Sequence, residues 1–154
     1  LGSFEAQLLQ YPTLLALVPV TIGTAGNLGS ILAARLSTAF HLGTLSFDPR
    51  DENLAGNAVA TLALAVSIFP VVGGGAWGLT AIVSGVQLAP GTVVAISLIS
   101  GIALAILAIT VTVAVTYVAY QFQLDPDDVV IPVVTNTCDV LGIVVLFTTV
   151  QLLL

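Results

Sequence analysis

Charged residues are scarce in this sequence of 154 residues, and lysine is absent. Only 6% of the residues are charged, whereas 58% are hydrophobic, and the mean hydropathy is +1.16. So few charges leave too little polar surface to coat a water-soluble globule of this length. The composition therefore excludes a soluble domain and indicates a protein whose solvent is lipid.

Basic residues are almost missing. Eight acidic residues are balanced by only two arginines, Arg35 and Arg50, so the net charge is −6. Binding of nucleic acid or anionic lipid needs clustered basic side chains. This sequence has no such cluster, so both functions are excluded. A cationic ligand fits the charge better.

Cysteine occurs once, at Cys138, within an apolar stretch. A single cysteine cannot form an intrachain disulfide, and the simplest interpretation of Cys138 is a small packing residue. A signal peptide is not predicted, because no basic region and cleavage site precede the first apolar run.

Long apolar segments dominate what is present. They lie at about residues 13–38, 54–84, 92–122 and 127–154. Each is long enough to cross a bilayer as a helix. Pro19 is expected to kink the first segment, and Pro70 with the glycines at 73–75 to bend or break the second. The predicted fold class is an all-α integral membrane protein of the cell membrane, a bundle of four transmembrane helices in a single transmembrane domain.

A membrane β-barrel is the alternative that residues 109–117 suggest, because they alternate threonine with valine and alanine at the period of a strand. Barrel strands of about ten residues need turn signals between them. The apolar segments are far longer, so helices are the better interpretation.

The polar loop at residues 41–53 orients the chain. Arg35, Arg50 and His41, interpreted as a loop histidine, flank or occupy it, so the positive-inside rule predicts a cytoplasmic loop. The connection at residues 121–127 would then also be cytoplasmic, and both chain ends would face outward. An outward N-terminus without a signal peptide is awkward, so we expect one more helix upstream.

Asp139 is the most informative residue. It lies 11 positions after Asp128, which is about 16 Å along a helix and near the bilayer centre. An ionised carboxylate there costs about 2.5 to 3.5 kcal/mol, so it normally faces a bundle interior or an aqueous cavity, and a functional role is the default interpretation. A hydrogen-bonded structural aspartate at a helix contact is the alternative.

Helical spacing extends a polar stripe from Asp139. Asn136 and Thr135 precede it by three and four residues, and Pro132 and Asp128 continue the stripe toward the loop. Pro132 cannot donate to the carbonyl of Asp128, so this oxygen is free for an ion or water. Such oxygens are ligands of hard cations.

Acidic residues open the last segment. Asp125 before Pro126 predicts a helix N-cap followed by proline, and Asp127 and Asp128 are favoured there by the helix dipole. A vestibule that concentrates cations is the alternative role for these acids.

The first segment contains a run of small residues at 23–30. A phosphate loop needs a preceding strand and a following lysine, and neither is found. Gly23 and Gly26 are better interpreted as allowing close packing of a second helix, while Asn27 on the neighbouring face can offer its carbonyl oxygen inward.

Glu52 and Asn57 are weak candidates, and Arg35 and Trp77 have structural interpretations. Glu52 and Asn57 lie at a helix end, where polar residues are usually only solvated. Arg35 is expected to snorkel to the interface, and Trp77 to fill apolar space or anchor the outer interface.

Two stretches resemble the membrane domain of the MgtE-type magnesium transporter family, PVTIGTAGNLGSILAAR at residues 19–35 and DPDDVVIPVVTNTCDVLG at residues 125–142. The residues at 1–5 also look like the end of that family's first helix. By this resemblance residues 1–10 end a preceding helix, and the intact domain has five helices.

The resemblance implies a homodimer whose ion path runs between the helices that are the first and last segments here. The family's pore carboxylate, which binds hydrated Mg²⁺, matches Asp139, and its glycine and asparagine run matches Gly23, Gly26 and Asn27. The resemblance also admits other divalent cations, such as Mn²⁺ and Co²⁺. The 154 residues contain no counterpart of the cytoplasmic regulatory domains that bacterial members carry before the membrane part. Other members are membrane halves alone, so pairing with a second homologous half is an alternative.

The leading hypothesis is therefore a divalent cation channel or transporter for Mg²⁺, with Asp139, Asn136, Thr135, Asp128, Asn27, Gly23 and Gly26 at the metal path. A proton-coupled transporter that uses Asp139 as its relay is the runner-up. An intramembrane aspartyl protease needs two carboxylates in one site, and only Asp139 lies deep. A purely structural membrane module is the remaining alternative.

Overall fold

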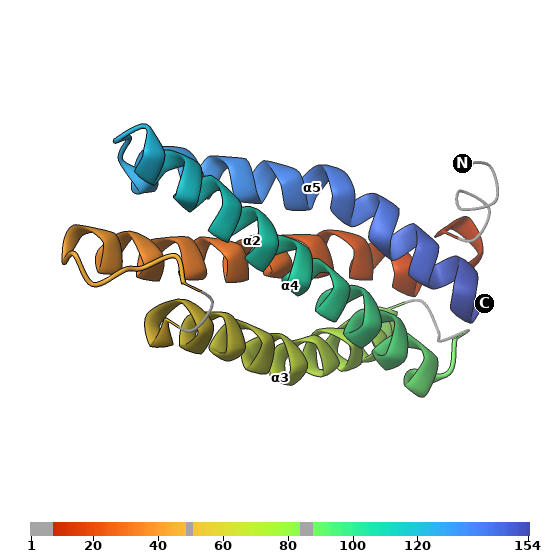
Figure 1. Ribbon diagram of the computed structural model, residues 1–154. Coiled ribbons are helices and arrows are strands. Elements are labelled where there is room, and N and C mark those ends of the chain that lie inside the picture. Colours follow the sequence, from red (N-terminus) through yellow and green to blue (C-terminus); the bar gives the residue numbers. More distant parts are fainter. Residues whose placement is uncertain (1–7, 49–50, 84–87) are drawn as a thin grey trace.

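The computed structural model describes residues 8–48, 51–83 and 88–154. In Figure 1 the long helices run side by side. They are α2 (Pro12–His41), α3 (Glu52–Val83), α4 (Pro90–Gln121) and α5 (Pro126–Leu153), each long and apolar enough to cross a membrane. The predicted all-α membrane bundle is confirmed. Residues 109–117 lie within α4, so the strand interpretation is wrong.

The helix ends lie within three residues of their expected positions. Residues 8–10 are helical and precede Tyr11. Residues 1–7, which carry most of the expectation of a preceding helix, lie outside the described residues, as do Arg50 in the first loop and the predicted end of the second segment at residue 84.

Proline and aspartate set where the helices begin. Pro12, Pro90 and Pro126 each stand at the start of a helix, where the missing N–H of proline has no helical partner to lose. Asp125 caps α5 as predicted, because its side chain accepts a hydrogen bond of 3.0 Å from the Asp127 N–H.

Asp51 caps α3. Its carboxylate accepts hydrogen bonds from the Asn53 and Leu54 N–H groups at 2.7 and 3.1 Å. It also accepts from the hydroxyl and the N–H of Ser46, which tie the preceding loop to the helix. The hydrogen bonds from Ser46 contribute most to lowering the pKa of Asp51 to about 2, because they favour the charged carboxylate.

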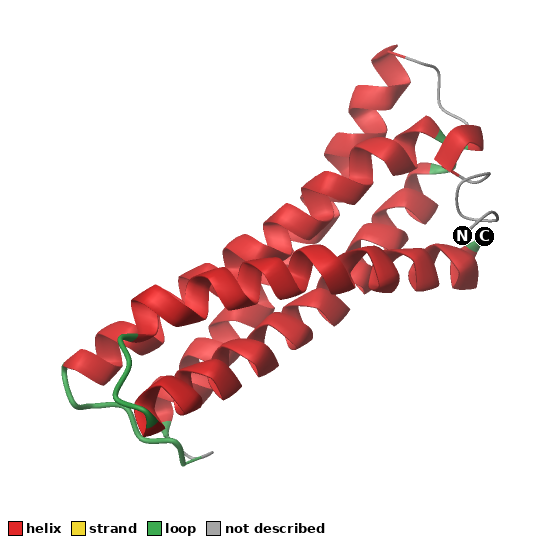
Figure 2. Ribbon diagram, turned by 90° about the horizontal axis from the view of Figure 1, so that it is seen from above, coloured by secondary structure: helices red, strands yellow, loops and turns green. Residues whose placement is uncertain are grey.

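Helices α2 and α4 form the centre of the bundle, with α3 and α5 on opposite sides of this pair. Each of the central helices packs against the other and against both flanking helices. The chain crosses from end to end four times, so the loop after α2 and the connection before α5 meet at the same end (Figure 2). Phe40 packs edge-on against Tyr120 there, with ring centroids 5.8 Å apart.

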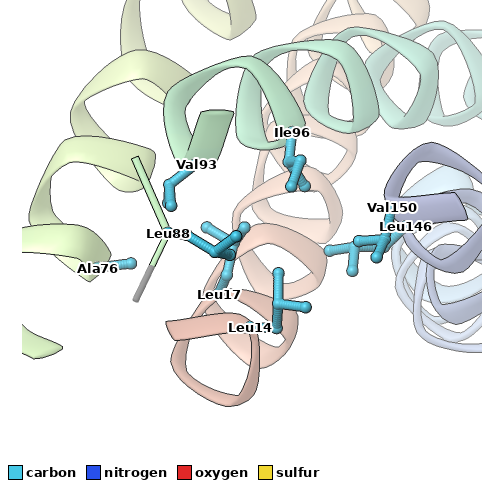
Figure 3. Packing of buried hydrophobic residues seen from close by; sticks show 8 residues of the cluster. All are labelled: Leu14, Leu17, Ala76, Leu88, Val93, Ile96, Leu146 and Val150. Carbon is cyan, nitrogen blue, oxygen red and sulfur yellow. The ribbon is translucent and has the colours of Figure 1, made fainter. Parts of the chain in front are cut away.

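The core consists of three apolar clusters along the bundle. Figure 3 shows the cluster at the end opposite these loops, where Leu14 and Leu17 of α2 contact side chains of the other helices. The side chain of Trp77 packs against it and donates its indole N–H to the Leu88 carbonyl at 3.3 Å. Trp77 is therefore a half-buried packing residue with a satisfied polar atom.

Of the bend or break expected in the second segment, the break does not occur, because α3 is one helix through Pro70 and residues 73–75. Close contact with α4 accompanies this stretch. The Ser97 hydroxyl donates to the Phe69 carbonyl at 2.7 Å, and a Cβ on Gly73 would come within 2.9 Å of the Val94 Cα. Proline is tolerated inside a membrane helix when neighbouring side chains pair with backbone groups near it. Helix α2 likewise runs through Pro19.

Candidate functional site

Helices α2 and α5 run antiparallel and meet along small side chains, a contact that we name the α2–α5 seam. A Cβ on Gly26 would lie 3.8 Å from the Thr135 Cα and 4.0 Å from the Cys138 Cβ. Gly29 lies against Val134 too closely for any Cβ. The packing role predicted for Gly26 and for buried Cys138 therefore fits the structure, since each occupies this contact.

Gly142 of α5 supplies the seam's third close approach. A Cβ on this glycine would lie 2.9 Å from Ile22. Gly23, by contrast, has nothing within 4 Å of the position of a Cβ, so it takes no part in close packing within this chain.

Most predicted site residues are exposed beside this seam. We name as the polar face the exposed residues Gly23, Asn27, Asp128, Pro132, Asn136 and Asp139. Thr135 is half-buried at its edge, and Gly26 is buried beneath it. Apart from half-buried Thr135, the sequence stripe on the last helix is thus exposed.

The two halves of the polar face turn to the same side. Asn27 follows Gly26 by one residue, a rotation of about 100°, whereas Ala25 before Gly26 is buried in a cluster with side chains of α3 and α4. Asp139 similarly follows Cys138, which is buried in a cluster that includes α4. Asn27 and Asp139 therefore both lie on the side of the seam that α3 and α4 leave open.

The Thr135 hydroxyl has a defined orientation. It donates to the main-chain carbonyls of Ile131 and Pro132, at 3.0 and 3.2 Å. A hydroxyl has one proton and two lone pairs, so Thr135 Oγ1 can act only as an acceptor toward any further group. An oxygen of this kind suits a cation or the water bound to it.

The weaker candidates on the second segment belong elsewhere. Arg35 donates from Nη1 to the Asn57 Oδ1 at 3.3 Å, which links α2 to α3. Asn57 is thus engaged on the flank opposite α5, and Glu52 is the first residue of α3. Neither is brought to the polar face.

His41 is the residue whose place the sequence did not indicate. It is the last residue of α2 rather than a loop residue, and its Nε2 lies 3.6 Å from the Asp125 Oδ1. The two residues are 84 positions apart, and only the antiparallel packing of α2 and α5 brings them together. No local sequence pattern encodes that approach.

The polar face presents carboxylate, amide and hydroxyl oxygens on a surface that is otherwise apolar. Exposed Ile143 lies one helical turn from Asp139 on α5, and exposed Val140 follows it. Oxygen ligands without imidazole or thiolate suit hard divalent cations.

Comparison with known proteins places the chain in a family. Residues 18–149 match the family model of MgtE, described as a divalent cation transporter. No curated protein and no solved structure matches the chain significantly. The matched range covers α3 and α4 in full and most of α2 and α5, and each of these four helices can span a membrane, so the protein is a multi-pass integral membrane protein. The chain belongs to the MgtE family of divalent cation transporters.

Proposed function

We propose that this divalent cation transporter carries Mg²⁺ as a largely hydrated ion along the polar face, between two copies of the chain. The observation that carries the proposal is the exposure of Asp139 halfway along an apolar helix. A carboxylate facing lipid at that depth is unfavourable by about 2.5 to 3.5 kcal/mol. A second polar face set against the first replaces the lipid with water and oxygen ligands.

The second copy also supplies the additional oxygen ligands that Mg²⁺ requires. Mg²⁺ prefers six oxygens in an octahedron and loses its water reluctantly. A two-fold axis beside Asp139 supplies one carboxylate from each copy, which bind the ion through its water shell. A second, homologous half of different sequence would serve the same role, and this is the alternative to a homodimer.

Each remaining residue of the path has a role that follows from its position. Asn136 and Asn27 offer amide oxygens, and Thr135 a hydroxyl oxygen whose proton is already donated. Gly23 leaves open space, so a hydrated ion can come close to the backbone of α2. Asp128, nearer the loop end, attracts cations toward the path. Ions of similar charge, such as Mn²⁺ and Co²⁺, are expected to compete.

Mg²⁺ flux into proteoliposomes tests this proposal. The full-length protein is reconstituted as wild type, as Asp139→Asn and as Thr148→Val, a control on α5 whose hydroxyl only donates to the Val144 carbonyl. We expect Asp139→Asn to lower flux at least tenfold with the dimer retained, and Thr148→Val to leave it unchanged.

Undiminished flux in Asp139→Asn would contradict the proposal. Proton uptake driven by a pH gradient without any divalent ion, lost in Asp139→Asn, would instead identify a proton relay.

A further inference from the structure

Three potential metal ligands meet at the loop end of the α2–α5 seam, separate from Asp139. His41 ends α2, Asp125 caps α5, and Asp127 lies in the first turn of α5. Each offers one ligand atom, and these atoms all lie within 4.8 Å of one another. Ligands bound to one ion at about 2.0–2.2 Å are at most about 4.4 Å apart, so small rotations of these exposed side chains suffice to bind one ion.

The contacts already made leave these ligands available. Asp125 Oδ1 accepts one hydrogen bond, from the Asp127 N–H, and a carboxylate offers about four lone-pair positions. The distance of 3.6 Å between His41 Nε2 and Asp125 Oδ1 is longer than a hydrogen bond. The imidazole and the carboxylate therefore approach one another without being bonded, with a separation that one ion can bridge.

Space beside the ligands completes the site. A hollow of about 600 Å³ adjoins His41 and Asp125, and Gln121, Gln123 and Tyr120 also line it. The side chains of His41 and Asp125 are 51% and 49% exposed. An ion held there has room for the water molecules that fill its remaining coordination positions.

One imidazole nitrogen with two carboxylate oxygens suits Mn²⁺, Co²⁺ or Zn²⁺, whereas Mg²⁺ takes oxygen ligands. We propose that His41, Asp125 and Asp127 bind a divalent transition-metal ion. The bound ion joins the end of α2 to the start of α5, the two helices of the polar face. This site is distinct from the Mg²⁺ path in its ligands and in its place along the seam.

The simpler explanation is that the acids only complement the dipole of α5 and that His41 only attracts Asp125. Both interactions would exist without metal. They predict no preference for transition metals and no separate role for Asp127.

Titration of the purified full-length protein with Co²⁺, followed by visible absorption, separates these explanations. We expect one ion to bind per chain with Mg²⁺ present in excess. His41→Ala should abolish the spectrum, and Asp127→Asn should weaken binding about tenfold or more. Asp128→Asn is the matched control, because it removes the same charge one residue away. Helix content by circular dichroism verifies that each variant is folded.

Unchanged Co²⁺ binding in His41→Ala would overturn the proposal, as would equal weakening by Asp127→Asn and Asp128→Asn. Asp139→Asn should retain the spectrum. Because the measurement is binding rather than flux, a failure of the Mg²⁺ path would leave this result intact, and loss of the spectrum in Asp139→Asn would place the ion at Asp139 instead.

Discussion

Asp51 shows how one partly exposed side chain fixes both a loop and a helix start. Hydrogen bonds from Ser46, Asn53 and Leu54 all end on its carboxylate. They lower the pKa of Asp51 to about 2, below the value of about 3.9 in an unfolded chain. Its stabilising effect is therefore complete above about pH 4 and is lost as the pH falls toward 2.

Thermal unfolding in detergent, compared between wild type and Asp51→Ala at several pH values, tests this expectation. The variant should melt at a lower temperature at pH 7, and the difference should disappear toward pH 2. Glu52→Gln, which removes a charge from the first turn without removing the cap, serves as the control. A difference that persists at pH 2 would contradict the argument.

Individual residues also show which features the sequence predicts and which it does not. The intramembrane Asp139, the cap at Asp125 and the packing of Gly26 are local features that spacing and residue type predict, whereas the close approach of Gly142 to Ile22 was not predicted. The approach of His41 to Asp125 and the pairing of Arg35 with Asn57 depend on how separate helices pack. Such contacts need the tertiary arrangement before they can be seen.

At the scale of the helices, the sequence predicts existence and type well because long apolar runs in lipid can only be helices. Proline and three glycines predict a bend or a break in α3, and the continuous helix excludes the break. The sequence did not predict the close contact between α3 and α4 in this stretch. Gly101 receives the ring of Phe69 at a distance that leaves no space for a Cβ.

That contact predicts a specific destabilisation. Gly101→Ala should lower the free energy of unfolding by about 1–3 kcal/mol, because the Phe69 ring must move. In a Phe69→Leu background the same substitution should cost less, since the ring is gone. Gly74→Ala, where a Cβ meets open space within a helix, is the control and should not lower the free energy of unfolding, because alanine is the better helix former. Equal costs in both backgrounds, measured by denaturant unfolding in detergent, would show that the ring contact is not the cause.

At the scale of the whole molecule, the polar face predicts which side of α5 meets a second copy. Ile143 follows Asp139 by one helical turn and is exposed. Val144 is also exposed, but it lies about 100° from Ile143 around the helix axis, on the side toward α4. With Cys138 replaced by serine, Ile143→Cys should cross-link between copies in native membranes. Val144→Cys should cross-link far less.

Both variants are treated with a short bifunctional thiol reagent, and the fraction of cross-linked dimer is measured from gel mobility. Preferential cross-linking of Val144→Cys would place the interface on the α4 side of α5 and contradict the proposed path.

The position of α5 at the edge of the bundle has a mechanical consequence. Helix α2 packs against α3, α4 and α5, whereas α5 packs chiefly against α2 and α4. A displacement of α2 disturbs three helix contacts, and a displacement of α5 disturbs two. Widening or narrowing of the proposed path is therefore least costly when α5 pivots on the glycines of its seam while the other three helices stay fixed. In that proposal the carboxylate of Asp139 moves with α5.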